Sequence, residues 1–243
     1  MEKINLVSLI EKYYLDGTVE SAIWNIKDNK ATIKFTTQYK NLVGIITSDN
    51  FDLDDCEIGI YNTSQFLKFV RITDSYLELK LNRNTAQQAV ELAISDNQYD
   101  LKYVLSNLDL IERVKTVNEP DAYDANFLID NEFTDKYLKA KKALGDVNRF
   151  TVNAEYVQDE GMYIVFEIGD NANHANKIKF NVLGEAMLGL NQLAFPADLF
   201  NDILKVNVGN TGKIEISEHG ILKASFKEKD ITATYYLVCL NES

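Results

Sequence analysis

Hydrophobic positions near the start of the chain first follow the spacing of a helix and then that of strands. Apolar side chains recur at i, i+3, i+4 and i+7 from Leu6 to Tyr13, which predicts a helix over Ile4–Tyr14 that Gly17 ends. Period-two alternation follows and predicts three strands, with a tight turn at Asp28-Asn29. The expected buried positions of these strands are Ala22, Trp24 and Ile26, then Ala31, Ile33 and Phe35, then Val43 and Ile45.

The same succession of one helix and three strands recurs along the chain, giving four units of roughly 60 residues each. Asn62 or Thr63 caps the second helix, Thr134 is the expected N-cap of the third, and Pro196 lies in the first turn of the fourth. The strands that follow these helices are expected at Tyr76–Leu81, Val90–Ile94 and Leu101–Leu105, at Phe150–Val157, Tyr163–Ile168 and Ile178–Val182, and at Lys213–Ser217, Leu222–Lys227 and Thr232–Cys239.

An acidic stretch separates the first two units from the last two. Residues 109–132 hold seven acidic side chains, two basic ones and Pro120, a composition typical of a boundary between domains. We therefore expect an N-terminal domain over 1–108, an acidic connector over 109–132 and a C-terminal domain over 133–243. Each domain should be of the α+β class, with helices on one face of antiparallel sheets.

Composition places the chain among globular proteins. It has 243 residues, 46% of them hydrophobic, and a net charge of −12 from 37 acidic and 25 basic side chains. No apolar run approaches the ~18–20 residues needed to cross a bilayer. The first residues lack the basic and apolar regions of a secretory signal. We expect no membrane partner and a cytoplasmic location, which is the host cytoplasm if the protein is viral.

Residues that often carry catalysis or bind metals are few and scattered. Cys56 and Cys239 lie far apart, which fits a reducing compartment, and His174 and His219 lie in turn-like segments where solvated side chains are expected. The sequence has no glycine-rich phosphate loop, no His-Glu-x-x-His and no Gly-x-Ser-x-Gly. We therefore expect no enzymatic activity, no metal and no cofactor.

Lysines gather on the polar sides of the helices although the chain as a whole is acidic. Residues 134–149 hold five basic and two acidic side chains, and helical spacing places Lys139 and Lys142 opposite the apolar stripe. Lys68 and Arg71 likewise lie away from the apolar stripe of the second helix. One such helix is ordinarily a solvated face, but the recurrence suits contact with a polyanion. Lysines without interleaved aromatics favour weak, sequence-independent contact with duplex phosphates.

These features together resemble the DNA sliding clamps, and most of all the polymerase clamp of T4-like bacteriophages. Residues 51–70 resemble the strand that leads into the second helix of the phage clamps, with an acidic turn, an Ile60-Tyr61 strand end and a Phe66-Leu67 pair. Residues 223–226 and 234–238 are similar to the closing hairpin of clamps. The resemblance covers the element order of essentially the whole chain.

The resemblance implies a two-domain sliding-clamp fold of four helix-plus-antiparallel-strand units, with three identical subunits closed into a ring. Twelve helices would line the hole, duplex DNA would pass through it without sequence preference, and the ring would tether the replicative DNA polymerase. The implied partners are duplex DNA, DNA polymerase, a clamp loader and two further copies of the chain. The residues expected to face DNA are Lys12, Lys68, Arg71, Lys136, Lys139, Lys142 and Lys205.

The resemblance also implies two protein-binding surfaces. Clamps hold the tails of partner proteins in a pocket near the connector and the C-terminal strands, and they join subunits by pairing edge strands. The candidates for the pocket are Val114, Val117, Leu128, Tyr235 and Tyr236, although core packing is an alternative for each one singly. The candidates for the subunit interface are Leu101, Tyr103 and Leu105 on one strand and Ile178, Phe180 and Val182 on another.

Two hypotheses of other classes compete with a clamp. A viral structural or adaptor protein that forms rings or tubes without DNA would explain the strands and the acidity, but not the lysines on the helices. A hydrolase would need two converging carboxylates, for which Asp54, Asp55 and Glu57 are the densest candidates. A solvated turn explains these acids more simply. A monomeric processivity factor is a further alternative to the closed trimer.

Overall fold

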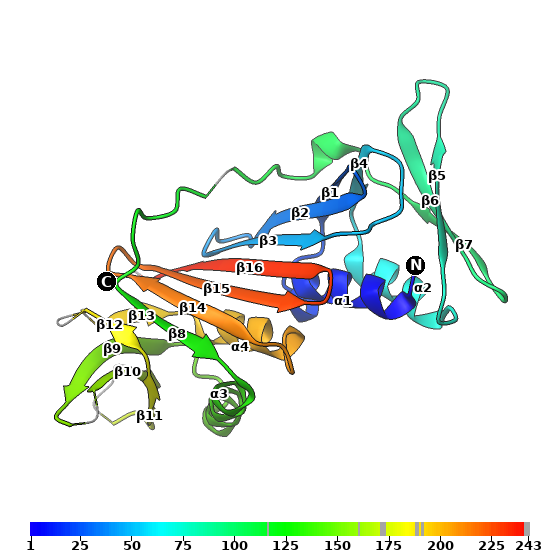
Figure 1. Ribbon diagram of the computed structural model, residues 1–243. Coiled ribbons are helices and arrows are strands. Elements are labelled where there is room, and N and C mark those ends of the chain that lie inside the picture. The colour runs from blue at the N-terminus through cyan, green and yellow to red at the C-terminus, as the bar shows by residue number, and fades with distance from the viewer. Residues whose placement is uncertain (116, 160, 171–173, 188–189, 191, 241–243) are drawn as a thin grey trace. The chain divides into compact units, whose positions relative to one another are not determined.

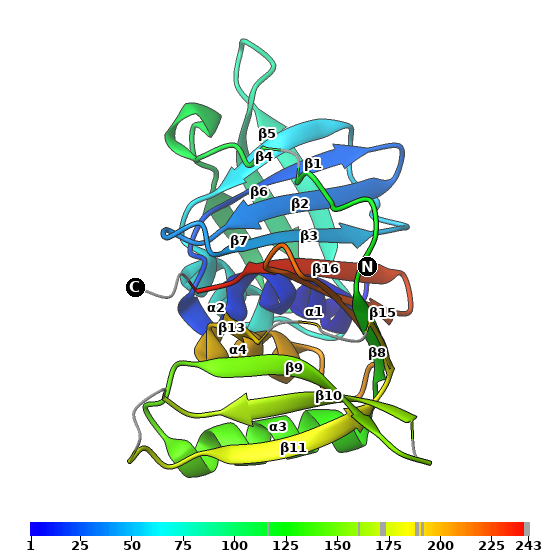
Figure 2. The ribbon, with the colours of Figure 1, turned by 90° about the vertical axis from the view of Figure 1, so that its left-hand side faces the viewer.

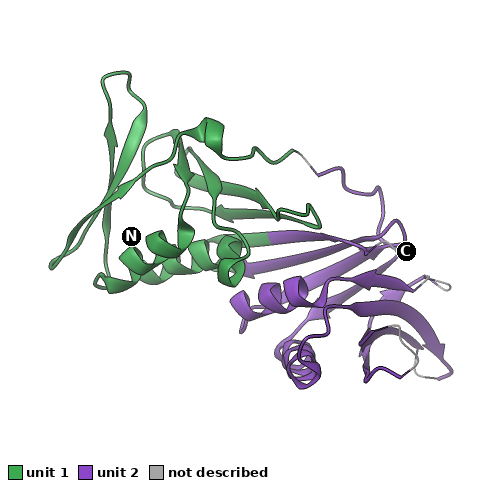
Figure 3. Cartoon of the chain, turned by 180° about the vertical axis from the view of Figure 1, so that it is seen from behind, with its two compact units in different colours: residues 1–116, 228–233 green, residues 117–227, 234–243 purple. Residues whose placement is uncertain are grey.

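The chain folds into two units, each with two helices and two groups of antiparallel strands (Figures 1 and 3). The computed structural model describes residues 1–115, 117–159, 161–170, 174–187, 190 and 192–240. Unit 1 comprises residues 1–116 and 228–233, and unit 2 comprises residues 117–227 and 234–243. The tip of the last hairpin therefore belongs with the N-terminal half of the chain.

Unit 1 contains helices α1 (Lys3–Tyr14) and α2 (Thr63–Ile72). Its strands follow the orders β3-β2-β1-β4 and β5-β6-β7. Their bounds are β1 Ala22–Lys27, β2 Lys30–Thr36, β3 Leu42–Ser48, β4 Cys56–Ile60, β5 Glu78–Arg83, β6 Ala89–Ser95 and β7 Asp100–Val104, with short 3-10 turns at Leu15–Gly17 and Leu108–Leu110.

The hairpin of β1 and β2 turns at Asp28 and Asn29, as predicted from the sequence. Both residues adopt positive φ, 53° and 57°, the conformation that two-residue hairpin turns require. Trp24 lies at the centre of the core on the inner face of the sheet, with ring centroids of Tyr13, Phe51 and Phe66 at 6.0, 5.8 and 5.8 Å. The apolar stripe of each helix in this unit is thereby held against the sheet.

Strand β3 turns its other face to the core, so the prediction for it was wrong. Leu42, Gly44 and Ile46 are buried, whereas Val43 and Ile45 are only half-buried on the outer side. The reason lies at Gly44, which pairs with Phe35 of β2. A Cβ atom at Gly44 would lie 2.0 Å from the Phe35 ring, so only glycine leaves room for that ring in the core.

Unit 2 contains helices α3 (Asn131–Leu144) and α4 (Ala197–Val206), and Figure 2 shows α3 behind the sheet of β9, β10 and β11. Its strands follow the orders β12-β8-β14-β15-β16 and β11-β10-β9-β13. Their bounds are β8 Ala125–Ile129, β9 Phe150–Val157, β10 Gly161–Ile168, β11 Ile178–Leu183, β12 Glu185–Ala186, β13 Leu193–Phe195, β14 Gly212–Ser217, β15 Ile221–Glu228 and β16 Ile231–Val238.

Helix α3 begins earlier than the sequence predicts. Its N-cap is Asp130, whose carboxylate accepts the N–H of Phe133 at 2.8 Å. Thr134 is therefore not the N-cap. Its side chain lies inside the first turn, where the hydroxyl donates to the carbonyl oxygen of Asp130 at 2.9 Å. Phe133 is buried in an aromatic cluster around Phe150, which is the core of unit 2.

The stretch expected as a connector, 109–132, includes the whole of strand β8. Ala125, Phe127 and Ile129 alternate as buried residues along it, and β8 pairs with β12 and β14 inside unit 2. Before β8, the described residues 111–115 and 117–124 form an irregular segment that is neither helix nor strand. Within that segment Arg113 belongs to unit 1 and Glu119 to unit 2.

Glu119 fixes the end of the irregular segment to unit 2. Its carboxylate accepts hydrogen bonds from Lys223 Nζ at 2.7 Å, Tyr236 Oη at 2.5 Å and Tyr123 Oη at 3.3 Å. Lys223 Nζ also lies 5.5 and 5.7 Å from the ring centroids of Tyr123 and Tyr236. The bonds from Lys223 and Tyr236 hold the pKa of the Glu119 carboxyl below its usual value. The carboxylate is therefore stabilised in its charged form.

We expect Glu119→Gln to loosen residues 117–124. Because the folded pKa of Glu119 is lowered, its contribution is complete above the unfolded value of about 4.3 and is lost as pH falls through the folded pKa. Amide hydrogen exchange near neutral pH should be about fivefold faster in the variant, corresponding to about 1 kcal/mol for a partly exposed pair. The exposed Glu218, changed to Gln, serves as the control. Equal exchange in both variants would show that Glu119 does not hold the segment.

Candidate nucleic-acid interface

Helix α2 presents two cations to solvent. Asn62 caps it by accepting the N–H of Gln65 at 2.9 Å, and Phe66 and Val70 are buried beneath it. Lys68 and Arg71 are consequently exposed on its other side. Arg71 Nη2 reaches Glu11 Oε1 of α1 at 2.6 Å, an exposed ion pair.

Helix α3 presents three lysines in the same manner. Tyr137 and Ala140 are buried, which leaves Lys136, Lys139 and Lys142 exposed on the outer side. Lys136 pairs with Glu132 at 2.6 Å and Lys139 with Asp135 at 3.1 Å, each one turn earlier in the helix. The helix thus carries its positive charge toward its C-terminal end, where the helix dipole favours it.

Helix α1 contributes less than expected, and α4 contributes the one cation that was expected of it. Lys12 is only 1% exposed, and its Nζ lies 2.9 Å from Glu228 Oε2, so the prediction that it faces DNA was wrong. Ser8 Oγ donates to the same carboxylate oxygen at 2.9 Å. Lys205 of α4 is exposed but lies 3.3 Å from Asp202. Lys12 therefore tethers the tip of the last hairpin to α1.

The exposed cations remain available to an external anion. Exposed ion pairs such as Arg71–Glu11 contribute about 0–1 kcal/mol each, so a phosphate can replace the carboxylate at little cost. Lys68 and Lys142 form no ion pair with any residue in the described part of the chain. The exposed members of the predicted set are Lys68, Arg71, Lys136, Lys139, Lys142 and Lys205.

The five residues expected to form a pocket for partner tails differ in their unit and in their burial. Val114 belongs to unit 1, whereas Val117, Leu128, Tyr235 and Tyr236 belong to unit 2. Tyr235 is fully buried, and its hydroxyl accepts from Asn207 Nδ2 at 3.2 Å, which makes it part of the core. Tyr236 is nearly buried beneath Glu119. Only Leu128, with 74% of its surface exposed, presents a large apolar face to solvent.

The strands expected at the subunit interface both lie at sheet edges. Strand β7 ends the order β5-β6-β7, and β11 ends the order β11-β10-β9-β13. On β7, Tyr103 is buried against Phe66, and its hydroxyl donates to the carbonyl oxygen of Asn62 at 3.1 Å. Tyr103 and the nearly buried Leu105 therefore support the strand from within. Another chain would therefore bind β7 and β11 mainly through the backbone N–H and C=O groups at their free edges.

Two of the three acids considered for catalysis, Asp55 and Glu57, make structural contacts instead. Asp55 Oδ1 accepts the N–H of Asp28 at 3.0 Å. Glu57 forms a two-bond ion pair with Arg113, at 2.9 and 2.8 Å, which keeps the pKa of its carboxyl below the usual value. A carboxyl held in its charged form is poorly suited to donate a proton.

Among the residues that the structure describes, no three His, Cys, Asp or Glu side chains are grouped as a metal ion would require. His174 and His219 lie exposed in turns, as expected. None of the helices in the described ranges is long and apolar enough to cross a membrane.

Reasoning from the sequence passed over one group of charged residues. Lys27 and Lys34 project from the outer face of β1 and β2, beside the Arg113–Glu57 pair. The period-two alternation that placed Trp24 and Ile33 in the core could have revealed these lysines. Residues between buried positions of a strand lie together on the opposite face of the sheet.

Comparison with known proteins shows the fold. No family model matches the sequence, and neither does any curated protein. A structure of A. fulgidus proliferating cellular nuclear antigen (PCNA) bound to the C-terminal region of FEN-1 matches with a TM-score of 0.78 at 14% identity, over 100% of this chain and 98% of that one. PCNA from Entamoeba histolytica matches at 0.74 and 17% identity, over 99% and 96%. The PCNA2-PCNA3 complex from Sulfolobus tokodaii matches at 0.72 and 11%, over 100% and 98%. The chain has the α+β fold of the PCNA-type sliding clamps over its whole length.

Proposed function

We propose that the protein is a sliding clamp that encircles duplex DNA and tethers the replicative DNA polymerase. The observation that carries the proposal is the exposed cationic face that α2 and α3 each carry, on a chain of net charge −12. The full-length likeness in fold to the PCNA-type clamps supports the same reading. The competing hypothesis, a structural protein that holds no DNA, leaves that cationic face unexplained.

Contact with DNA would be electrostatic and mobile. Lys68, Lys139 and Lys142 end in flexible point charges that can exchange from one phosphate to the next. Each phosphate contact is weak, so the ring would slide along the duplex and not stop at a sequence. Retention would then come from closure of the ring, and the protein would need no chemistry of its own.

The ring would be built from three copies by pairing β7 of one copy with β11 of the next. On β7, the N–H of Leu105 donates to Val90 of β6, so the N–H groups at Lys102 and Val104 should face the free edge. Strand β11 offers the matching free edge in unit 2. Neither edge is blocked by proline.

The partners of the ring would be DNA polymerase and a clamp loader. The A. fulgidus PCNA structure with the C-terminal region of FEN-1 supports capture of protein tails by this fold. In unit 2, exposed Leu128 and half-buried Val117 are the members of the predicted pocket that a tail could reach. The sequence resemblance to T4-like phage clamps makes a viral replication protein, working in the host cytoplasm, our proposal for its source.

Sedimentation tests the ring. We expect a species of about 83 kDa, three times the 27.6 kDa of one chain. Lys102→Pro, which removes an edge N–H of β7, should shift the mass to that of the single chain, whereas Lys102→Thr keeps the N–H and should leave the ring intact. A single-chain mass for the unaltered protein would refute the closed trimer.

Charge reversal tests the DNA contact. The double variant Lys68→Glu with Lys142→Glu should weaken binding to a short labelled duplex about tenfold at low salt and flatten the dependence on salt. Lys80→Glu with Lys229→Glu changes the net charge equally on exposed positions outside the helices and should change affinity less than about twofold. Equal weakening by both pairs, measured by fluorescence anisotropy, would indicate only a general charge effect.

The buried pair Lys12–Glu228 should affect stability and not DNA binding. Glu228→Ala leaves the Lys12 ammonium buried without this carboxylate. We expect the free energy of unfolding, measured with denaturant, to fall by about 3 kcal/mol. Lys12→Met removes the charge as well, so it should be tolerated better and leave duplex affinity within about twofold. A large loss of duplex affinity in Lys12→Met, with unchanged stability, would show that Lys12 does contact DNA.

A further inference from the structure

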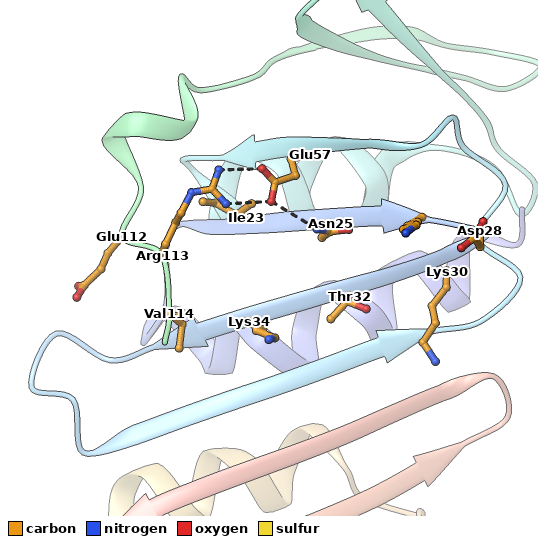
Figure 4. Close-up of a pocket in the computed structure, with 11 residues that line it drawn as sticks. Ile23, Asn25, Asp28, Lys30, Thr32, Lys34, Glu57, Glu112, Arg113 and Val114 are labelled. Atoms are coloured by element: carbon orange, nitrogen blue, oxygen red, sulfur yellow. Dashed lines mark hydrogen bonds and ion pairs between the residues drawn. The ribbon is translucent and has the colours of Figure 1, made fainter. Parts of the chain in front are cut away.

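Unit 1 carries a groove of about 600 Å³ on the outer face of its sheet, opposite the core (Figure 4). Its floor is formed by the outward side chains of β1 and β2, which alternate with the buried Trp24 and Ile33. Residues 112–114 form one wall. The groove lies entirely in unit 1 and shares only Val114 with the pocket expected from the sequence.

The wall of the groove is fixed by an ion pair. Figure 4 shows Arg113 reaching to Glu57 of β4, which it holds by two hydrogen bonds of 2.9 and 2.8 Å. Asn25 Nδ2 lies 3.4 Å from the same carboxylate. The neighbouring Glu112 turns to Lys40, at 2.9 Å. The two acidic side chains at this end are therefore already engaged by cations.

The floor of the groove is cationic at both of its ends. At the turn, Lys27 lies directly opposite Lys30 across the hairpin, an arrangement of like charges that destabilises a strand pair. Lys30 is drawn to Asp49 at 3.0 Å, and the exposed Asp28 carboxylate offsets part of the charge. At the connector end, Lys34 lies opposite Ile23. Neither Lys27 nor Lys34 forms an ion pair with any of the residues that the structure describes.

The spacing of these charges indicates the length of the ligand and the separation of its own charges. Lys30 and Lys34 are four residues apart on one strand, or about 13 Å at ~3.3 Å per residue. Between the two ends lie Asn25 and Thr32, which can hydrogen-bond, and Ile23, which is apolar. An extended peptide spans the same distance in four residues. Duplex DNA carries a charge every ~1.7 Å and binds to long basic surfaces. A walled groove with two separate cationic ends does not fit such a ligand.

We propose that this groove binds an acidic segment of a partner protein in extended conformation, with carboxylates four residues apart. One carboxylate would sit between Lys27 and Lys30, where it relieves the repulsion of the two ammonium groups, and the other would sit at Lys34. Asn25 and Thr32 would bind the peptide backbone between them. The proposal goes beyond DNA tethering and does not depend on ring closure, because all of these residues belong to one chain.

The test uses a fluorescein-labelled peptide with the sequence Gly-Ser-Glu-Leu-Thr-Val-Glu-Ser-Gly and the whole protein at about 50 mM salt. We expect saturable anisotropy, a loss of affinity of at least about tenfold in Lys27→Gln with Lys34→Gln, and unchanged affinity in the control Lys80→Gln with Lys229→Gln, whose two lysines are exposed and lie outside the groove. A peptide with both glutamates replaced by glutamine should bind at least about tenfold more weakly. An unchanged unfolding midpoint in each variant confirms that the fold is kept.

Three results would overturn the proposal. These are the absence of saturable binding, binding that ignores the Lys27 and Lys34 substitutions, and equal affinity for the glutamine peptide. Tighter binding of a single-stranded oligonucleotide with the same dependence on Lys27 and Lys34 would instead assign the groove to nucleic acid. If the unaltered protein sediments as a single chain and still binds the peptide, the groove stands although the closed trimer has failed.

Discussion

The packing of one apolar stripe per helix against a sheet is the constraint from which the rest of this structure follows. In unit 1 the stripe is held by aromatic contacts around Trp24, and in unit 2 by those around Phe150. Because these rings fix the rotation of each helix, whatever lies on the opposite side must face solvent. The exposed lysines of α2 and α3 are thus placed by residues that never touch a ligand.

The same chemistry of lysine and carboxylate serves opposite purposes at different depths. Lys12 is buried and its ammonium meets the partly exposed carboxylate of Glu228, so loss of that carboxylate would leave a buried charge without this partner. Lys139 and Asp135 meet in solvent, where the pair contributes little and can open. Glu119 lies between these extremes, since several donors share one partly exposed carboxylate. Burial, more than the identity of the pair, decides whether a charge is structural or free to act.

The sequence sufficed to predict elements whose signal is local. The turn at Asp28-Asn29, the stripe of α1 and most strand positions depend on neighbours within a few residues, and these predictions were confirmed. The failures came from partners distant in the chain. The inward face of β3 depends on the Phe35 ring beside Gly44, and the burial of Lys12 depends on Glu228. Strand β8 shows alternating apolar residues, but its acidic surroundings suggested a linker.

Tyr235 and Tyr236 illustrate the limit for the candidate site. Both were candidates for the pocket, although adjacent residues of a strand point to opposite faces. Tyr235 enters the core beside Asn207, and Tyr236 is covered on the other face by Glu119, more than a hundred residues earlier in the chain. No local pattern could show that both faces of this strand are occupied.

The pairing of Lys12 with Glu228 bears on how the protein is made. The first helix leaves the ribosome before the last hairpin, and the carboxylate that neutralises its buried ammonium lies 216 residues later in the sequence (228 − 12). Until then Lys12 must stay hydrated, so the N-terminal half cannot reach its final packing during synthesis. Completion of the packing around α1 therefore waits for the synthesis of residue 228 and does not accompany the emergence of the first half of the chain.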